Sequence, residues 1–147
     1  CLPGTRTKMQ ESLLIHLGKA GNRFVWLRGS PGTGKTAICK SIASTLDERG
    51  TLVASFFWDK NQKGTGLDSI EMFASTLAYQ LARFSEDFKI SLVQHLQEQA
   101  LEKVQSLPLE EQMEALIIKP MRGIKDMFTS RAREERLVIV LDALDEC

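Results

Sequence analysis

Apolar residues recur every three or four positions in four segments of the chain, which is the spacing of one face of a helix. These segments are residues 9–17, 38–46, 70–84 and 90–104. A fifth helix is predicted over 109–119, and it should end at Pro120 because proline interrupts helical hydrogen bonding. A shorter helix is predicted near 121–132.

Polar residues and glycines mark where several of these helices should begin and end. Thr7 and Gln10 match a capping box ahead of the first helix, and Gly50 stands where the second helix should stop. Asp68 and Glu71 are candidate caps for the third helix. These signals agree with the helices that the apolar periodicity predicts.

Three short runs rich in β-branched and aromatic residues predict strands. They are FVWL at 24–27, TLVASFFW at 51–58 and LVIVL at 137–141. The last run is apolar on both faces, as expected of a central strand in a parallel sheet. Helices that alternate with such strands predict an α/β fold of three layers with a mainly parallel sheet.

A glycine-rich stretch lies between the first predicted strand and the second predicted helix. It reads GSPGTGKT and matches the phosphate-binding loop G-x-x-x-x-G-K-[ST] in full, with the strand and the helix that this motif requires on its two sides. Its residues are Gly29, Ser30, Pro31, Gly32, Thr33, Gly34, Lys35 and Thr36. Lys35 is expected to hold the β and γ phosphates of ATP, and Thr36 to bind the accompanying Mg²⁺. A turn that binds nothing is the alternative, and the full match makes it the weaker one.

Three carboxylates follow the last predicted strand. Asp142 comes directly after its apolar residues, and the site of a bound nucleotide needs an acid there to complete the magnesium shell opposite Thr36. Asp145 and Glu146 come next and are the candidate catalytic residues that orient or deprotonate the attacking water. Glu146 is the favoured base, and the alternative is that both are surface acids.

Composition narrows the choice of partner and compartment. Nineteen Lys and Arg residues balance nineteen Asp and Glu residues, so the net charge gives no reason to expect binding to nucleic acid or a membrane. The three cysteines, Cys1, Cys39 and Cys147, have no CxxC spacing, which argues against a disulfide framework or a zinc site and favours the cytoplasm. Cys39 lies on the apolar stripe of its helix and is expected to pack in the core.

GSPGTGKT and the later LVIVLDALDE together resemble a NACHT nucleoside triphosphatase, of the STAND class of signalling ATPases. Ala143 directly after Asp142, followed by Asp145 and Glu146, is similar to the D-[GAS]-h-D-E form of NACHT domains. The stretches CLPGTR, ASFFWDKN, STLAYQLA and LIIKPM resemble NACHT regions of fungal signalling and incompatibility proteins. The resemblance implies that the segment from Leu2 to Arg6 lies near the adenine.

The resemblance also implies a division of the protein into parts. Residues 1–147 would be the first part of the NTPase domain, with the sensor strand and the winged helix absent from this span. Flanking effector and repeat domains would respond to exchange of ATP for ADP, and the activated state could be a homo-oligomer. A missing strand between 24–27 and 137–141 would leave an empty lane in the sheet, so we expect residues 1–147 alone to be marginally stable and weak in ATP binding.

Other functions built on the same loop are less well matched. A nucleotide kinase needs an acceptor site and an arginine-bearing lid, and a GTPase needs N-K-x-D, which the chain lacks. A related AAA+-like ATPase or helicase and a binding-only scaffold stay open as alternatives. His16 and His95 are expected to be helix-surface or internally bonded histidines, and the cluster Arg131, Arg133 and Arg136 to be a solvated face.

Overall fold

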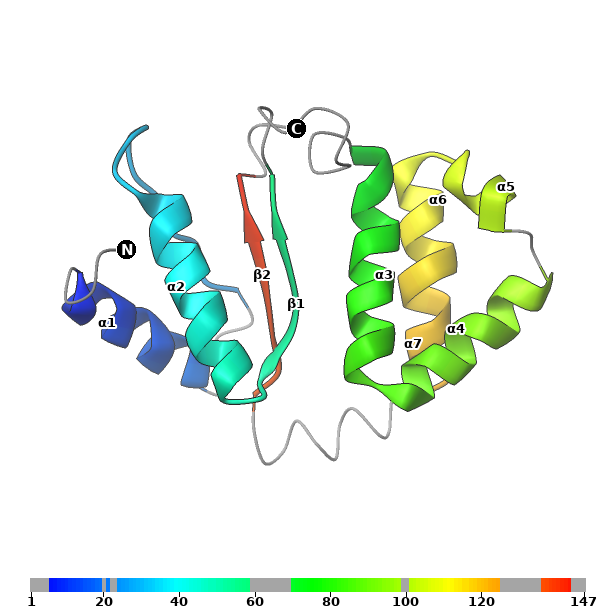
Figure 1. Cartoon of the computed structure of the whole chain (residues 1–147), viewed down its shortest axis with the longest axis horizontal. Coiled ribbons are helices and arrows are strands. Elements are labelled where there is room, and N and C mark those ends of the chain that lie inside the picture. Colours follow the sequence, from blue (N-terminus) through cyan, green and yellow to red (C-terminus); the bar gives the residue numbers. More distant parts are fainter. Residues whose placement is uncertain are drawn as a thin grey trace.

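Two parallel strands stand between two groups of helices (Figure 1). The structure is a computed structural model, and it describes residues 6–19, 21, 24–58, 70–98, 101–124 and 136–143. Its elements, in chain order, are α1 (Thr7–Gly18), α2 (Lys35–Glu48), β1 (Leu52–Phe57), the 3₁₀ turn η1 (Ile70–Met72), α3 (Phe73–Phe84), α4 (Glu86–Glu98), α5 (Leu101–Gln105), α6 (Leu109–Met113), the π-helical turn η2 (Glu114–Ile118), α7 (Lys119–Arg122) and β2 (Val138–Asp142).

The two strands confirm the predicted α/β class and two of the three predicted strands. β1 and β2 run parallel, with Ser55 opposite Val140 and Phe57 opposite Asp142. A parallel pair needs a long crossover connection, and the helices from α3 to α7 lie on this connection. Among the described residues these two strands form the sheet.

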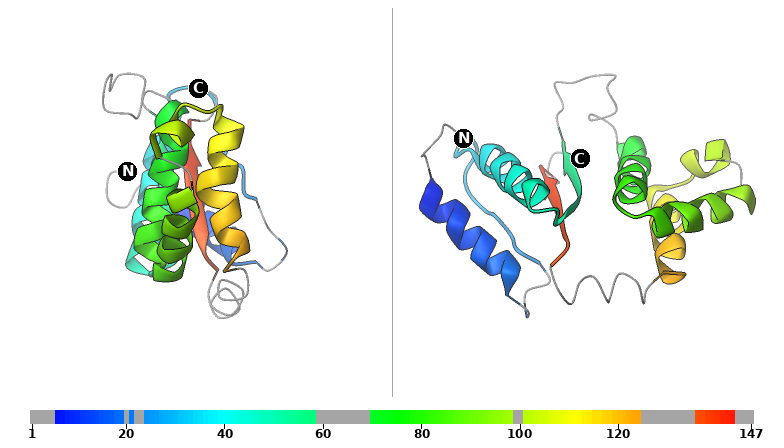
Figure 2. Two further views of the ribbon diagram at one scale, coloured as in Figure 1. Left: turned by 90° about the vertical axis from the view of Figure 1, so that its right-hand side faces the viewer. Right: turned by 60° about the horizontal axis from the view of Figure 1, so that its bottom comes forward.

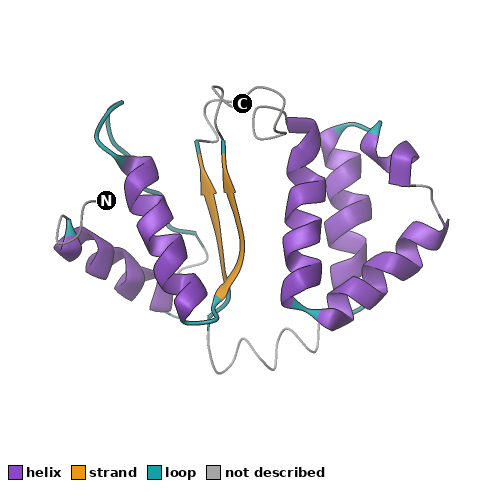
Figure 3. Ribbon diagram, viewed as in Figure 1, coloured by secondary structure: helices purple, strands orange, loops and turns teal. Residues whose placement is uncertain are grey.

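Helices cover the strands from both sides, and each side has its own apolar cluster (Figures 2 and 3). On one side Ile38, Ile42 and Leu46 of α2 pack against Val138 and Val140 of β2. On the other side Phe56 of β1 packs with residues from α3, α4 and η2, among which Leu81, Phe88 and Leu116 are also fully buried. The second cluster is the larger one and holds the crossover helices to the sheet.

The predicted buried strand at 24–27 is wrong. Residues 24–30 have no regular secondary structure, and Phe24 and Trp26 are 84% and 74% exposed. Leu27 alone packs against the α2 cluster. A strand is stable only when its backbone N–H and C=O groups are paired. β2 is paired with β1, and no described strand pairs with residues 24–27. The apolar composition of 24–27 was therefore insufficient to make it a strand.

β2 differs from the expected central strand on one face. Val138 and Val140 are covered by α2, whereas Ile139 and Leu141 on the opposite face are 48% and 38% exposed. The helices of the crossover pack mainly over β1 on that side. The sequence predicted that both faces of this strand are buried, and only the face toward α2 is covered.

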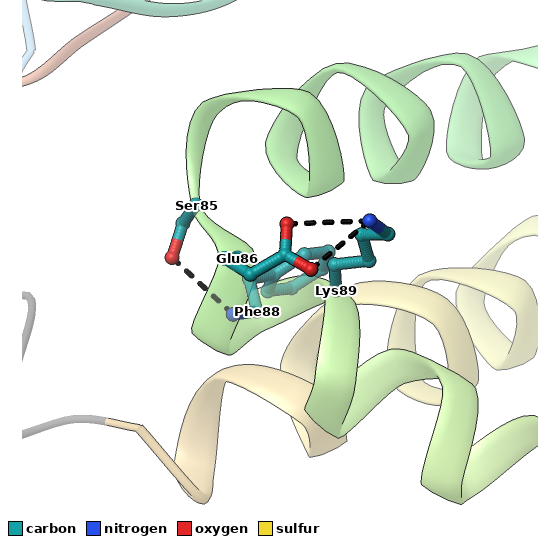
Figure 4. A network of polar contacts seen from close by, with 4 residues as sticks. All are labelled: Ser85, Glu86, Phe88 and Lys89. Carbon is teal, nitrogen blue, oxygen red and sulfur yellow. Dashed lines mark hydrogen bonds and ion pairs between the residues drawn. The ribbon is translucent and has the colours of Figure 1, made fainter.

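The predicted stripe of α4 and the residues after it is only partly buried, because Leu96 and Val104 pack in the core while its first residues do not. Ile90 and Val93, which marked the expected apolar stripe, are 51% and 49% exposed, while Phe88 and Leu92 are buried. Ser85 comes directly before the helix, and its hydroxyl accepts a hydrogen bond from Phe88 N–H at 3.2 Å (Figure 4). This cap sets the rotation of the first turn and points Phe88 into the core.

The predicted helix break at Pro120 is also wrong. The chain continues from α6 through η2 into α7, and Pro120 lies in the first turn of α7, where its missing N–H costs little. The wide π turn immediately before it fits this change of hydrogen-bonding pattern. The helix predicted near 121–132 is present only as the end of α7, and 125–132 lies outside the described residues.

The predicted start signals had mixed outcomes. Arg6, and not Thr7, is the cap of α1, and no side chain caps the helix there. Glu71 lies inside η1, while Asp68 lies outside the described residues. Gly50 follows α2 with a φ of 69°, as a glycine past a helix end should.

In the part of the chain that the structure describes, no helix has the length and apolarity to cross a membrane.

Candidate functional site

The phosphate-loop residues and the strand-end acid meet at one end of the sheet. β1 and β2 point their carboxyl ends toward the end of the molecule where the 29–34 loop leads into α2 (Figure 3). α2 lies against β2, so its first turn is beside the last residues of that strand. The fold therefore brings two regions together that are distant in the sequence.

The 29–34 loop has the backbone shape that its glycines permit. Gly32 and Gly34 have φ values of 76° and 78°, in the left-handed region that other residues rarely adopt. The N–H and the hydroxyl of Thr33 both donate to the Ser30 carbonyl, at 3.3 and 2.7 Å. These two bonds close the loop into a tight turn immediately before α2.

Lys35 is folded back over this turn. Its ammonium group donates to the carbonyls of Gly29 at 2.9 Å and Ser30 at 3.2 Å. An ammonium has three N–H donors, so these two bonds hold it across the loop with capacity for a further acceptor. The positive end of the α2 dipole lies at the same place, because Lys35 is the first residue of that helix.

Arg6 adds a second cation to the loop, and the motif did not predict it. Its guanidinium donates to the Thr33 carbonyl, and a Cβ placed on Gly34 would lie 2.6 Å from Arg6 Nη1. A side chain at position 34 would therefore strain the backbone and require the arginine to shift. The resemblance placed Leu2 to Arg6 near the adenine; Arg6 contacts the phosphate loop, and 2–5 lies outside the described residues.

Asp142 ends β2 as a buried carboxylate. It is 8% exposed, and its Oδ2 atom is buried with no hydrogen-bond partner among the described residues. Its backbone carbonyl accepts from Trp58 N–H at 3.3 Å, which fixes the strand end in place. A buried carboxylate oxygen without a partner is costly, and a metal ion would compensate it. Asp142 lies at the end of β2, where the sequence predicted an acid, and its magnesium ligation stays a prediction.

The charges of both Asp142 and Lys35 act on the Cys39 thiol. It is partly buried and is not part of the α2 core cluster, so the expected packing in the core is not confirmed, and a hydrogen bond with Asp142 is among the causes of its pKa shift. Burial, the Asp142 charge and this hydrogen bond raise the pKa of Cys39 from 9.0 to about 11, while Lys35 lowers it. No spacing or motif in the sequence indicates that these residues are close, because their approach depends on how α2 is placed on β2.

The donor set fits a magnesium nucleotide. Thr36 is an exposed hydroxyl in the first turn of α2, and Asp142 supplies a hard carboxylate oxygen, which is the ligand type that Mg²⁺ prefers. Asp145 and Glu146, the candidate catalytic acids, lie outside the described residues. The described residues contain no cluster of three His, Cys, Asp or Glu side chains that could hold a metal ion.

The histidines are bonded within their own helices, as expected. Nδ1 of His16 lies 2.7 Å from the Ser12 carbonyl, and Nδ1 of His95 lies 2.8 Å from the Ser91 carbonyl. Arg136 donates to the Leu17 carbonyl at 3.4 Å, so it joins β2 to α1 in place of forming a purely solvated face. Arg131 and Arg133 lie outside the described residues.

Comparison with known proteins places the chain in a family. Searches of the curated proteins and of the solved structures give no match. A scan of protein families matches residues 7–147 to the family described as nephrocystin 3, N-terminal, which is related to the NACHT family but distinct from it. Since the match spans both the phosphate loop and Asp142, the chain belongs to the nephrocystin 3, N-terminal family.

Proposed function

We propose that the chain binds Mg-ATP as the nucleotide-binding part of a NACHT-type signalling switch that hydrolyses ATP slowly. The observation that carries this proposal is the position of Asp142 beside the first turns of α2. A buried carboxylate with an unpartnered oxygen lies next to the helix that begins with the phosphate loop. Charge in this position is expected where a cation binds.

Different groups in and beside the loop would bind different parts of a magnesium nucleotide. Backbone N–H groups of 32–36 and the dipole of α2 would bind phosphate oxygens, and the Lys35 ammonium would move from its two carbonyls to the β and γ phosphates. Thr36 and Asp142 would hold Mg²⁺, which neutralises charge on the phosphates and polarises the γ-phosphate. Glu146, or Asp145 in its place, would orient the attacking water.

The same assignment extends to the fold and to the cellular role. A P-loop NTPase fold of three α/β/α layers agrees with the parallel strand pair and with helices on both of its sides. In the switch that we propose, ATP and ADP set the arrangement of flanking effector and repeat domains in the cytoplasm, and the activated state forms a homo-oligomer. The second candidate is another ATPase built on this loop, which the match to a family other than NACHT itself favours.

Removal of the Lys35 charge tests the nucleotide assignment. Lys35→Ala should weaken binding of a fluorescent ATP analogue in Mg²⁺ by about 100-fold, because it deletes the cation nearest the β and γ phosphates. Lys40→Ala is the matched control: it removes the same charge from an exposed position of α2, above the Phe57 ring. Equal affinity of Lys35→Ala and Lys40→Ala, with both variants folded, would contradict the proposal.

A further inference from the structure

Arg6 and Lys35 place two cations on the 29–34 loop, one at each end of it. The Lys35 ammonium donates to two carbonyls at the start of the loop, and the Arg6 guanidinium donates to the Thr33 carbonyl at its end. The guanidinium also lies over Gly34, since its Nη1, Cζ and Nη2 atoms are all within 3.4 Å of the place of a Cβ on that residue. A chain of phosphates along the loop would therefore meet a cation at each end.

Helix α1 holds the Arg6 backbone beside the loop. Arg6 is the N-cap of this helix, and its carbonyl accepts hydrogen bonds from the N–H groups of Met9 and Gln10, both at 3.1 Å. The helix itself is packed on α2, with Leu14 and Leu17 against the α2 cluster. Because the loop leads directly into α2, this packing fixes the start of α1 relative to the loop.

The backbone conformation of Arg6 is an unusual one. Its φ is 57°, in the left-handed region that residues with a side chain rarely adopt. Such conformations persist only where the surrounding structure holds them, and they are concentrated at ligand sites. Gly34 leaves room for the guanidinium, because a side chain there would require the arginine to shift.

Positive charge accumulates at this loop without a carboxylate bonded to it. Among the described residues, neither Arg6 nor Lys35 forms an ion pair, and both are bonded to backbone carbonyls. The positive end of the α2 dipole lies at the same place. Like charges that are held together repel, and an anion with several negative charges would neutralise them. A polyphosphate has this charge, and its length suits two cations at opposite ends of a loop.

We propose that Arg6 is a second phosphate-binding residue of the nucleotide site, which binds phosphate oxygens at the Gly34 end of the loop while Lys35 binds those at the other end. A guanidinium has five N–H donors in a planar fork, and the bond to the Thr33 carbonyl uses one of them. The inference rests on the proposed Mg-ATP site. It assigns Arg6 to the phosphates, whereas the resemblance implied a place near the adenine.

The experiment measures the affinities of ATP and of inorganic tripolyphosphate in Mg²⁺, by competition with the fluorescent ATP analogue. Arg6→Ala should weaken both by about 10-fold or more, because each ligand loses a charge-assisted hydrogen bond. Arg6→Gln can still donate to the Thr33 carbonyl but carries no charge, so it should weaken both ligands about as much. Arg6→Lys keeps the charge without the planar fork and should lose only about threefold.

Lys8→Ala is the matched control for charge. It removes a cation from an exposed position in the first turn of α1, and we expect it to change either affinity by less than about twofold. Thermal unfolding of each variant without ligand reports any damage to the fold. If Arg6→Ala weakens the fold, Arg6→Gln and Arg6→Lys still separate the charge of this side chain from its contact with the loop.

The remaining outcomes would overturn the role of Arg6. These are an unchanged affinity in Arg6→Ala, or an equal loss in Lys8→Ala. Full affinity of Arg6→Gln would show that Arg6 only joins α1 to the loop, and a loss for ATP without a loss for tripolyphosphate would place Arg6 at the nucleoside. If the original chain binds neither ligand, the proposed function itself is wrong. If Lys35→Ala weakens ATP binding and Arg6→Ala does not, the proposed function holds and only the role of Arg6 is wrong.

Discussion

The side-chain amide of Gln80 pairs with the backbone of Ser55 as a neighbouring strand would. Ser55 N–H donates to Gln80 Oε1 and Gln80 Nε2 donates to the Ser55 carbonyl, both at 2.8 Å. Gln80 lies on α3, on the side of β1 away from β2 (Figure 1). This pair satisfies two backbone groups at the outer edge of the sheet and blocks that position for another strand.

Gln80→Ala should therefore destabilise the fold. It leaves two partly buried backbone groups without their partners, and each such group costs about 1–3 kcal/mol when water cannot replace the bond. We expect a loss of about 2 kcal/mol in the free energy of unfolding, measured by urea denaturation. Ser75→Ala, which removes an exposed hydroxyl on the same helix, is the control and should change stability by less than about 0.5 kcal/mol. Equal stability of the two variants would show that the amide pair contributes nothing.

The burial of Phe88 and the exposure of Ile90 on α4 give a second stability prediction. Phe88 is fully buried, so Phe88→Ala should cost about 3–5 kcal/mol through the cavity that it leaves. Ile90→Ala, at a residue that is 51% exposed, should cost less than about 1 kcal/mol. Denaturant midpoints of the two variants are the measurement. A larger loss of stability in Ile90→Ala than in Phe88→Ala would contradict the burial seen in the structure and favour the stripe that the sequence periodicity predicted.

The Cys39 pKa predicts how this thiol responds to pH. The folded protein keeps the thiol protonated up to about pH 11, whereas an ordinary thiol titrates near 9.0. Only the thiolate is alkylated, so iodoacetamide at pH 8 should react about 100-fold more slowly with Cys39 than with a free cysteine. Mass spectrometry of a chain that carries Cys1→Ser and Cys147→Ser isolates this reaction. An alkylation profile with an apparent pKa near 9.0 would contradict the burial and the Asp142 contact.

The same shift sets the sign of its effect on stability. Because the folded-state pKa is raised, the unfolded chain releases the Cys39 proton first as pH rises. The contribution of Cys39 to stability is thus fully present below about pH 9 and is lost as pH rises through about 11. Cys39→Ser should flatten this part of the stability profile.

Hydrolysis should separate from binding at the acids that follow β2. Glu146→Gln should leave Mg-ATP bound but slow its hydrolysis, because it removes the proposed base and keeps the shape of the side chain. Phosphate release under single-turnover conditions is the measurement, with binding of the ATP analogue as the control. If Asp145→Asn stops turnover and Glu146→Gln does not, Asp145 is the base.

Local periodicity predicted much of this fold because helices and paired strands depend on residues close in sequence. The stripe Ile38, Ile42 and Leu46 correctly identified α2, and the LVIVL run identified β2. The segment 24–27 has the same apolar character, but a strand needs partners, and those are decided by the arrangement of the whole sheet. Helix α4 carries apolar residues on two faces, so periodicity alone could not decide which one is buried.

The candidate site also has parts that the sequence predicts and parts that it does not. The phosphate loop is a local motif whose spacing fixes its residues, and an acid that follows an apolar strand is equally visible in the sequence. The contacts of Cys39 with Asp142 and of Arg6 with Thr33 join elements that are far apart in the chain. Packing of α2 on β2 and the start of α1 create them, and no spacing rule encodes either one.

The most direct test of the account measures whether the phosphate loop and Asp142 form one magnesium-nucleotide site. Isothermal titration of ATP into the chain and into Asp142→Asn, each with Mg²⁺ and with EDTA, gives four affinities. We predict that Mg²⁺ tightens ATP binding by about tenfold or more in the original chain and by less than about threefold in Asp142→Asn, with similar affinities in EDTA. Equal tightening by Mg²⁺ in both proteins, or the absence of ATP binding to the original chain, would contradict the account.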